Sequence, residues 1–474
     1  MQNKKAYLWG LLSRFAPQAI YLLTTLVLAR FVSPNAFGTI GILSVIFMVA
    51  NILLDSGLGG SLIKENNITE LDCSTIGVFN IVVSLLIYII LFFLSGFIQN
   101  YFNIDGLSII VKVISVVFPI TAFGIVPLSL LKRNLQFNKI FISSISGVIV
   151  ASIGSIIIAV NGGDVYALVA YQILVNLVNV VINFIFSKYK FSLKFSSASL
   201  KRLIPFGFFT SVVTIVDALY ENIMTLLTGK FLNVQTAGYL YQAKRLEETS
   251  SSSAAMAVGI VAFPILTKLK DDLELFRTEC SKTFNTITLL VNPLLIVVSI
   301  FSTEIIILLF GKQWLLSASY LKILMLCGIF NLAEQLMSSF VKSLGRVRGL
   351  MNVTLIKRFI GLAILLLTLV ADARLLIYGY LLTTIIGCMI NIKLYSSLTQ
   401  KLFFTTFKSF LRNIIPSFVI FFICEIIFSY LPLLLPSRII ITLLLLVLYY
   451  MIYLRFRGIN VFIEMKSFLK NKCH

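Results

Sequence analysis

Apolar segments of about 20 residues recur along the whole chain, and no other feature constrains its fold as strongly. A helix of about 20 apolar residues crosses the roughly 30 Å hydrocarbon core of a bilayer. The chain is 59% hydrophobic and 12% charged, with a mean hydropathy of +1.00, whereas soluble domains carry about 25% charged residues. The sequence therefore predicts an all-α polytopic membrane protein.

We expect about fourteen spans, with bounds accurate to a few residues. Their approximate positions are 11–31, 38–60, 76–98, 107–131, 140–160, 164–187, 203–229, 236–264, 283–310, 317–341, 352–371, 373–394, 412–431 and 437–455. The segments between them are too short to form a separate catalytic domain. We also expect the first span to be retained, because no cleavage site of small residues follows it.

Basic residues concentrate in alternate loops, and this orients the spans. The segment 188–202, KYKFSLKFSSASLKR, carries five of them, and further groups follow the tenth span and the last span. Lys and Arg are enriched in cytoplasmic loops. The pattern predicts an even number of spans with both termini cytoplasmic. The net charge of +20 is thus explained by topology, and we expect no nucleic-acid partner.

Two decapeptides match at an offset of 200 residues. ARFVSPNAFG, residues 29–38, follows the first expected span, and GKFLNVQTAG, residues 229–238, follows the seventh. Six spans separate them, so both copies enter the membrane in the same direction. This predicts two six-helix lobes related by a pseudo-twofold axis along the membrane normal. We place the lobes at 1–195 and 196–400, with two extra helices and a basic cytoplasmic tail at 401–474.

Ionisable residues cluster in the seventh and eighth spans, where they are costly and therefore functional candidates. Asp217 and Glu221 share one helix face, as do Lys244 and Glu248. A hairpin turning near residue 232 would pair Glu221 with Lys244, and Asp217 with Glu248. The second pair is suited to sharing a coupling proton. The alternative is that these charges only form ion pairs that lock two helices together.

Other polar residues complete the candidate site. Arg14 lies about one turn inside the first span, where reaching back to the headgroups is the alternative to a binding role. Asp55 ends the second span and either faces a cavity or caps the helix. Arg245, Ser250 and Ser251 follow Lys244 in the eighth span. Glu334 and Glu425 are isolated within their spans, and we assign them no role.

Cysteine and histidine usage excludes several kinds of site. The six cysteines lie in or beside apolar runs without metal-binding spacing, which is typical of buried thiols. The only histidine is His474, the last residue. We therefore expect no histidine-based catalysis, no metal site and no cofactor.

Several quoted segments together resemble one family. SRFAPQ, LARFVSPNAFG, DSGLGGSLIKENNITELDCST, AGYLYQAKRL and LLFGKQWLLSASYLKIL occur in the order found in the polysaccharide-transport family, the Wzx-type flippases. The likeness covers most of residues 10–360. It implies the fold of the multidrug-extruding and lipid II-flipping proteins, with a central cavity lined by helices one, two, seven and eight.

The resemblance also implies a substrate, an undecaprenyl-pyrophosphate-linked oligosaccharide moved from the inner to the outer leaflet. Lys244, Arg245 and Arg14 would then bind the pyrophosphate, with Ser250 and Ser251 on the sugar. Asp217, Glu248 and Asp55 would bind a coupling ion, H⁺ or Na⁺. One departure affects Glu221, because many relatives carry an Arg–x–x–Asp pattern where this chain has Glu221 and Met224.

The resemblance implies further partners and leaves alternatives. Membrane lipids surround the chain, polymerase and chain-length proteins belong to such pathways, and we expect a functional monomer. A multidrug or organic-cation antiporter and a lipid II flippase share the implied fold. A membrane-embedded sugar or lipid transferase is a third alternative, but it needs carboxylate motifs in sizeable loops, which this sequence lacks. We therefore expect a transporter and not an enzyme.

Overall fold

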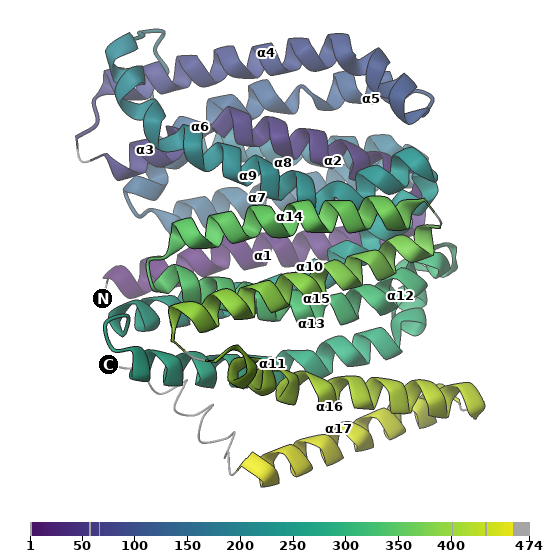
Figure 1. The fold of residues 1–474 in the computed structure, drawn as a ribbon. Helices are drawn as coiled ribbons and strands as arrows, with labels where there is room; N and C mark the ends of the chain where they lie inside the picture. The colour runs from purple at the N-terminus through teal and green to yellow at the C-terminus, as the bar shows by residue number, and fades with distance from the viewer. Residues whose placement is uncertain are drawn as a thin grey trace. The chain divides into compact units, whose positions relative to one another are not determined.

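The computed structural model describes residues 2–457, apart from 56–57, 66, 371, 401 and 432–433, and this part of the chain is helical without strands. The long helices follow from uninterrupted apolar runs that satisfy their own backbone hydrogen bonds. In the first half they are α1 Gln2–Phe31, α2 Pro34–Asp55, α3 Leu58–Lys64, α4 Glu70–Phe102, α5 Leu107–Ile114, α6 Val117–Arg133, α7 Phe137–Val160, α8 Asp164–Ser187 and α9 Ser197–Phe231. Figure 1 labels these elements in order.

The second half continues in the same way. Its elements are α10 Val234–Lys268, α11 Leu273–Ile300, α12 Ser302–Phe310, the 3₁₀ turn η1 Lys312–Trp314, α13 Leu315–Ser343, α14 Val347–Leu369, α15 Ala373–Leu398, α16 Phe403–Tyr430 and α17 Leu435–Arg457. Each expected span lies on one helix or on two consecutive helices, which confirms the polytopic all-α prediction.

The number of spans remains open. Within the described residues, 11 helical segments are long and apolar enough to cross a membrane. The other three expected spans lie on α9, α10 and α17. The polar run of α10, YQAKRLEETSSSS, lowers its hydropathy, and within the described side chains the apolar stretch of α17 is Leu435–Leu448. The count of fourteen therefore stays a prediction.

The helices group into two compact units. One unit contains Met1–Gln242 with Leu309–Trp314, and the other contains Ala243–Leu308 with Leu315–His474. The predicted lobe boundary at residue 195 differs from this grouping, because α9 and the start of α10 pack with the first unit. The boundaries of the symmetric lobes stay a prediction.

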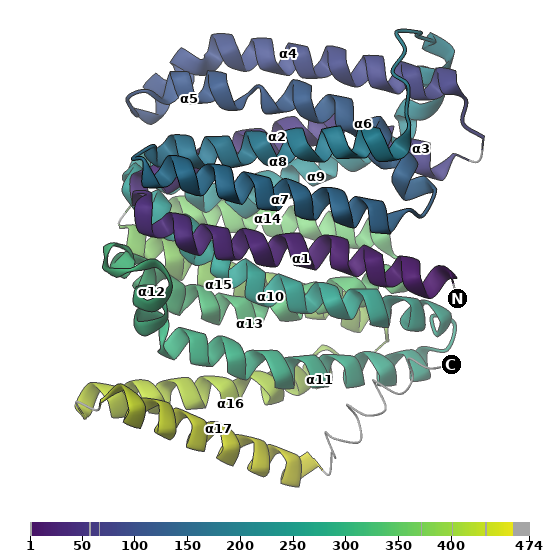
Figure 2. The ribbon, with the colours of Figure 1, turned by 180° about the vertical axis from the view of Figure 1, so that it is seen from behind.

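Each unit has its own helix packing. In the first unit α7 packs against α1 and α8, α6 against α8, and α2 against α9, and Figure 2 shows α1 beside α7. In the second unit α13 packs against α11 and α15, α14 against α15, and α16 against α11 and α17. Five cysteines, Cys73, Cys280, Cys327, Cys388 and Cys424, are buried free thiols, as expected. Cys473 lies outside the described residues.

The start of α4 shows how the sequence sets a helix end. Thr69 accepts a hydrogen bond from the backbone N–H of Asp72, and the Asp72 carboxylate accepts one from the Thr69 N–H, which forms a capping box. Arg202 of α9 then pairs with Asp72 at 2.8 Å. The buried carboxylate is thus satisfied by a cap and by a cation.

Candidate functional site

The two matched decapeptides meet in the structure. α2 begins at Pro34 and α10 begins at Val234, so their first turns are offset by the same 200 residues as the sequence repeat. A Cβ atom on Gly38 would overlap the carbonyl oxygen of Val234, and a Cβ atom on Gly238 would overlap that of Pro34. Such close backbone approach admits only glycine. The reciprocal contact has the geometry that a twofold axis between the two glycines produces.

A buried tryptophan supports this contact. Trp314 is fully buried, and its Nε1 donates a hydrogen bond to the Ala29 carbonyl at 2.8 Å. Its ring lies edge-on to Phe37 and to Tyr239, with ring centroids 5.2 and 5.9 Å away. Ala29 is in the last turn of α1, where carbonyls have no intrahelical donor. Trp314 therefore satisfies the end of α1 while packing beside both glycines.

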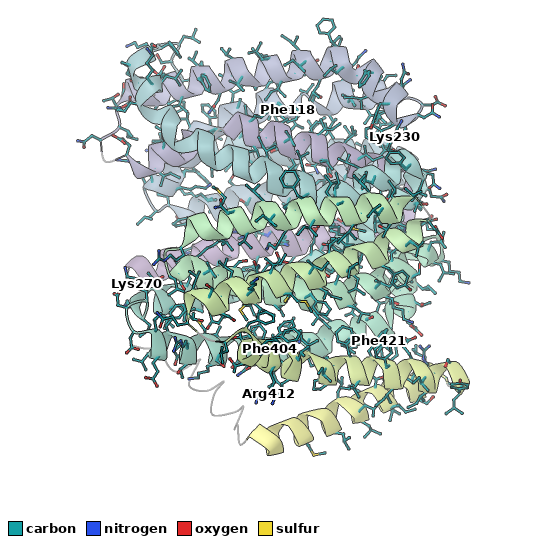
Figure 3. The ribbon with its side chains drawn as sticks, in the orientation of Figure 1. Phe118, Lys230, Lys270, Phe404, Arg412 and Phe421 are labelled. Atoms are coloured by element: carbon teal, nitrogen blue, oxygen red, sulfur yellow. The ribbon has the colours of Figure 1, made fainter. Side chains whose placement is uncertain are left out.

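Lys230 belongs to the second of the two matched decapeptides, and its side chain is anchored. It lies at the end of α9, as labelled in Figure 3, and its Nζ donates a hydrogen bond to the Tyr101 carbonyl. The same Nζ lies 4.2 Å from the centre of the Tyr101 ring. The cation–π contact offsets part of the cost of fixing this side chain. The first decapeptide has Arg30 at the position that matches Lys230.

The polar part of α10 contains most of the predicted site residues. Lys244 is 4% exposed, and its Nζ lies 3.5 Å from Glu248, whose side chain is half-exposed. Ser250 is exposed and donates a hydrogen bond to the Leu246 carbonyl at 2.9 Å. Arg245 is half-buried. The structure thus brings Lys244 and Glu248 together, as their spacing on one helix face predicts.

Glu247 is a candidate that sequence reasoning did not select. It is 1% exposed and accepts hydrogen bonds at Oε1 from Ser251 Oγ at 2.8 Å and from Asn331 Nδ2 at 3.2 Å. Ser251 was predicted to contact sugar, but it is buried and bonded to Glu247. Glu247 is bonded to Asn331 of α13, which lies 84 residues further along the chain. The helix periodicity of α10 alone could therefore not show that Glu247 is buried.

The remaining predicted residues are separate from this cluster or outside the described side chains. Arg14 on α1 and Glu221 on α9 are exposed. The side chains of Asp55 and Asp217 are not among those described. Glu221 and Lys244 belong to different compact units, so their pairing stays a prediction, as does the pairing of Asp217 with Glu248.

Glu334 and Glu425, to which no role was assigned, form ion pairs in the second unit. Lys357 Nζ lies 2.6 Å from Glu334 and 3.0 Å from Asn391 Oδ1. Lys322 lies 2.5 Å from Glu425. Lys357 is one of the basic residues that follow the tenth expected span, and it is 7% exposed and buried against α13 and α15. Its physical role is therefore to pair Glu334.

A cavity of about 870 Å³ lies within the first unit. Its walls come from α2, α3, α5, α6 and α8 and are mainly apolar. The polar and charged residues on its lining are Ser44, Asn51, Thr121, Ser129, Lys132, Gln172 and Asn176. Gly59 and Gly60 also line it. Their spacing in the sequence did not indicate this cavity.

Comparisons with known proteins identify a family and several relatives of this chain. The profile of a family described as polysaccharide biosynthesis protein matches residues 27–319. The lipopolysaccharide biosynthesis protein WzxC of Escherichia coli K12 is 25% identical over 81% of this chain and 78% of its own. The teichuronic acid biosynthesis protein TuaB of Bacillus subtilis 168 is 27% identical over 63% of this chain and 62% of its own.

The fold is also that of a solved flippase. The structure of the lipid II flippase MurJ in an inward closed conformation superposes with a TM-score of 0.74. It covers 95% of this chain and 99% of that one at 17% sequence identity. At this identity the match establishes the fold alone.

Proposed function

The chain belongs to the polysaccharide biosynthesis protein family, and from this premise we propose that it is a flippase for lipid-linked oligosaccharides. The observation that carries the proposal is the family match over residues 27–319, together with relatives named for lipopolysaccharide and teichuronic acid biosynthesis. The chain is accordingly a multi-pass membrane transporter and not an enzyme. Alternating access of a site between two lobes would move the glycan from the inner to the outer leaflet.

The substrate that we propose is an undecaprenyl-pyrophosphate-linked repeat unit. Lys244, Arg245 and Arg14 supply positive charge for the pyrophosphate, because Arg binds phosphate oxygens bidentately and Lys acts as a point charge. The exposed hydroxyl of Ser250 supports a contact with sugar hydroxyls. The prenyl tail stays in lipid, where its transfer into a polar site would cost free energy.

We further propose that transport is coupled to an ion gradient. Asp217 and Glu248 are the carboxylates that sequence reasoning assigns to the coupling ion, H⁺ or Na⁺, and Asp55 is a third candidate. The half-exposed side chain of Glu248 beside Lys244 supports access for a small ion. The proposal includes an inner-membrane location, cytoplasmic termini, a functional monomer, and polymerase and chain-length proteins as pathway partners.

Flipping by the purified full chain in liposomes tests this function. Lipid-linked repeat units are placed in the inner leaflet, and their arrival outside is followed by oxidation with an enzyme added externally. We expect Lys244→Ala and Arg245→Ala to slow flipping at least tenfold, because each removes a phosphate-binding cation. Lys270→Ala is the matched control, since Lys270 is an exposed lysine between α10 and α11. Full flipping by both α10 variants would refute the assignment.

A lipid II flippase is the second candidate, favoured by the fold match over 95% of the chain. The same liposomes loaded with lipid II separate the two substrates. Faster flipping of lipid II than of the repeat unit would favour this alternative. A multidrug antiporter predicts instead that deletion of the gene sensitises cells to toxic organic cations without loss of surface polysaccharide.

A further inference from the structure

We propose that Glu247 is a proton-binding residue, and that its charge state decides whether Lys244 is available to an anionic substrate. Glu247 binds the proton whatever the transported molecule is. The consequence for Lys244 rests on the proposed function, in which Lys244 binds a pyrophosphate. The proposal assigns the proton to Glu247 rather than to Glu248.

The first argument is burial without an ion pair. Among the described residues, the fully buried carboxylates are Asp72 and Glu247, each 1% exposed. Asp72 pairs with Arg202 at 2.8 Å, whereas no cation in the described part of the chain lies within 4.0 Å of Glu247. An ionised carboxylate in this position bears a large desolvation cost, which a bound proton removes.

The second argument is the asymmetry of the hydrogen bonds. Oε1 accepts from both Ser251 Oγ and Asn331 Nδ2. Oε2 is buried and has no hydrogen-bond partner among the described residues. A carboxylic acid has one carbonyl oxygen that accepts and one hydroxyl oxygen that carries the proton. The pattern matches an acid whose carbonyl is Oε1 and whose proton is on Oε2.

The third argument is the charge around the site. On α10 itself Lys244 and Glu248 interact with Glu247, and Cys327 of α13 and Tyr380 of α15 interact with it electrostatically. Lys244 is the only cation in this set. Its Nζ is buried without a hydrogen bond and lies 5.8 Å from the centre of the Tyr380 ring. Glu247 and Glu248 therefore compete for one ammonium.

Helix geometry makes this competition direct. Lys244, Glu247 and Glu248 are i, i+3 and i+4 on one face of α10. When Glu247 loses its proton, the new buried negative charge attracts Lys244 and compensates its positive charge, so Lys244 is no longer available to an anion. When Glu247 is protonated, Lys244 has only the half-exposed Glu248 as a counterion and can bind phosphate. Proton binding and anion binding at α10 therefore strengthen each other, and the coupling is reciprocal.

Infrared difference spectroscopy of the full chain tests the proton site without any substrate. A buried protonated carboxylic acid has a carbonyl stretch distinct from those of carboxylates and amides. We expect such a band in the wild type, its disappearance with rising pH, and its loss in Glu247→Gln, which keeps an acceptor at the position of Oε1. Glu248→Gln is the matched control and should keep the band.

A second variant guards against a folding defect in the first. Asn331→Ala removes one donor that stabilises the carboxylate, so we expect the band to persist to higher pH than in the wild type. A band that is unchanged in both Glu247→Gln and Asn331→Ala would overturn the proposal.

A binding measurement separates this inference from the proposed function. The probe is farnesyl pyrophosphate, a short soluble analogue of a prenyl pyrophosphate. In the wild type its affinity should fall about tenfold as the infrared band disappears, and in Glu247→Gln it should depend little on pH. Equal pH dependence in both proteins would overturn the switch. Absence of probe binding at any pH would refute the role of Lys244, while the infrared band still decides the proton site.

Discussion

At the scale of single residues, the buried ammonium of Lys357 depends on two acceptors, Glu334 and Asn391. A buried ion pair adds little net stability, but removal of one partner leaves an uncompensated charge in the interior. Gly387 lies close to the same carboxylate, since a Cβ there would approach Glu334 Oε2 to 2.7 Å. The site is therefore packed tightly, with little room for water to replace a lost partner.

We predict that Glu334→Gln lowers the free energy of unfolding by about 3–5 kcal/mol, because it removes the counterion of a buried lysine. The double variant Glu334→Gln with Lys357→Met should recover most of this loss. Thermal unfolding of the purified protein measures both. Glu425→Gln is the control, since its partner Lys322 is 36% exposed and is therefore not a buried charge. An equal loss in the control would contradict the argument.

Residue-scale roles were predicted only where one helix contained the whole interaction. Lys244 and Glu248 are four residues apart, so their spacing indicated the contact. Glu334 and Lys357 belong to different helices, and so do Glu247 and Asn331. No periodicity within one helix predicts which faces of α13, α14 and α15 meet. The sequence could thus identify charged residues in the spans but not their partners.

At the scale of elements, the first turns of α2 and α10 pack backbone against backbone. Gly38 and Gly238 each fill a position where a Cβ would overlap a carbonyl oxygen. Cα–H···O contacts at such glycines are individually weak, but side chains on either helix would prevent both. The repeat in the sequence predicted two equivalent turns, and the structure adds that they touch.

We predict that Gly38→Ala and Gly238→Ala each destabilise the protein by about 1–3 kcal/mol, the usual cost of overpacking. Because the contact is reciprocal, the double variant should cost less than the sum of the two single variants. Gly96→Ala on α4 is the matched control, because a Cβ there meets nothing within 4 Å. Additive losses in a double-mutant cycle would show that the two glycines act independently.

The helices themselves were largely predictable, and their ends were not. Apolar runs of about 20 residues located every long helix. α9 and α10 nevertheless extend to 35 residues each. They are longer than the expected spans at both ends, because the helical hydrogen bonding continues into the polar residues that flank each span. The division of the expected fourth and ninth spans into two helices each was also missed, since apolar composition continues across the breaks.

At the scale of the whole molecule, the distribution of 39 basic against 19 acidic residues is the strongest guide to orientation. The predicted topology places the segments around Lys188 and Lys270 on the cytoplasmic side and the turn at Asp105 outside. One span more or fewer would invert every later loop. The orientation is therefore tested as a whole rather than loop by loop.

We predict that alkaline phosphatase is active when fused after Asp105 and inactive when fused after Lys188 or Lys270, because the enzyme folds only outside the cytoplasm. A fluorescent protein fused at the same positions should give the opposite pattern and serves as the control. Phosphatase activity after Lys270 but not after Asp105 would refute the predicted orientation, with its cytoplasmic N-terminus.

The contact between the two turns is reciprocal, because Gly38 meets the Val234 carbonyl and Gly238 meets the Pro34 carbonyl. In a homodimer with twofold symmetry, a residue i of one subunit contacts j of the other, and j contacts i in return. The same relation holds here within one polypeptide, at an offset of 200 residues. The two turns thus contact each other as the two subunits of an isologous dimer do. A substitution at one glycine is therefore constrained by the residue at its counterpart.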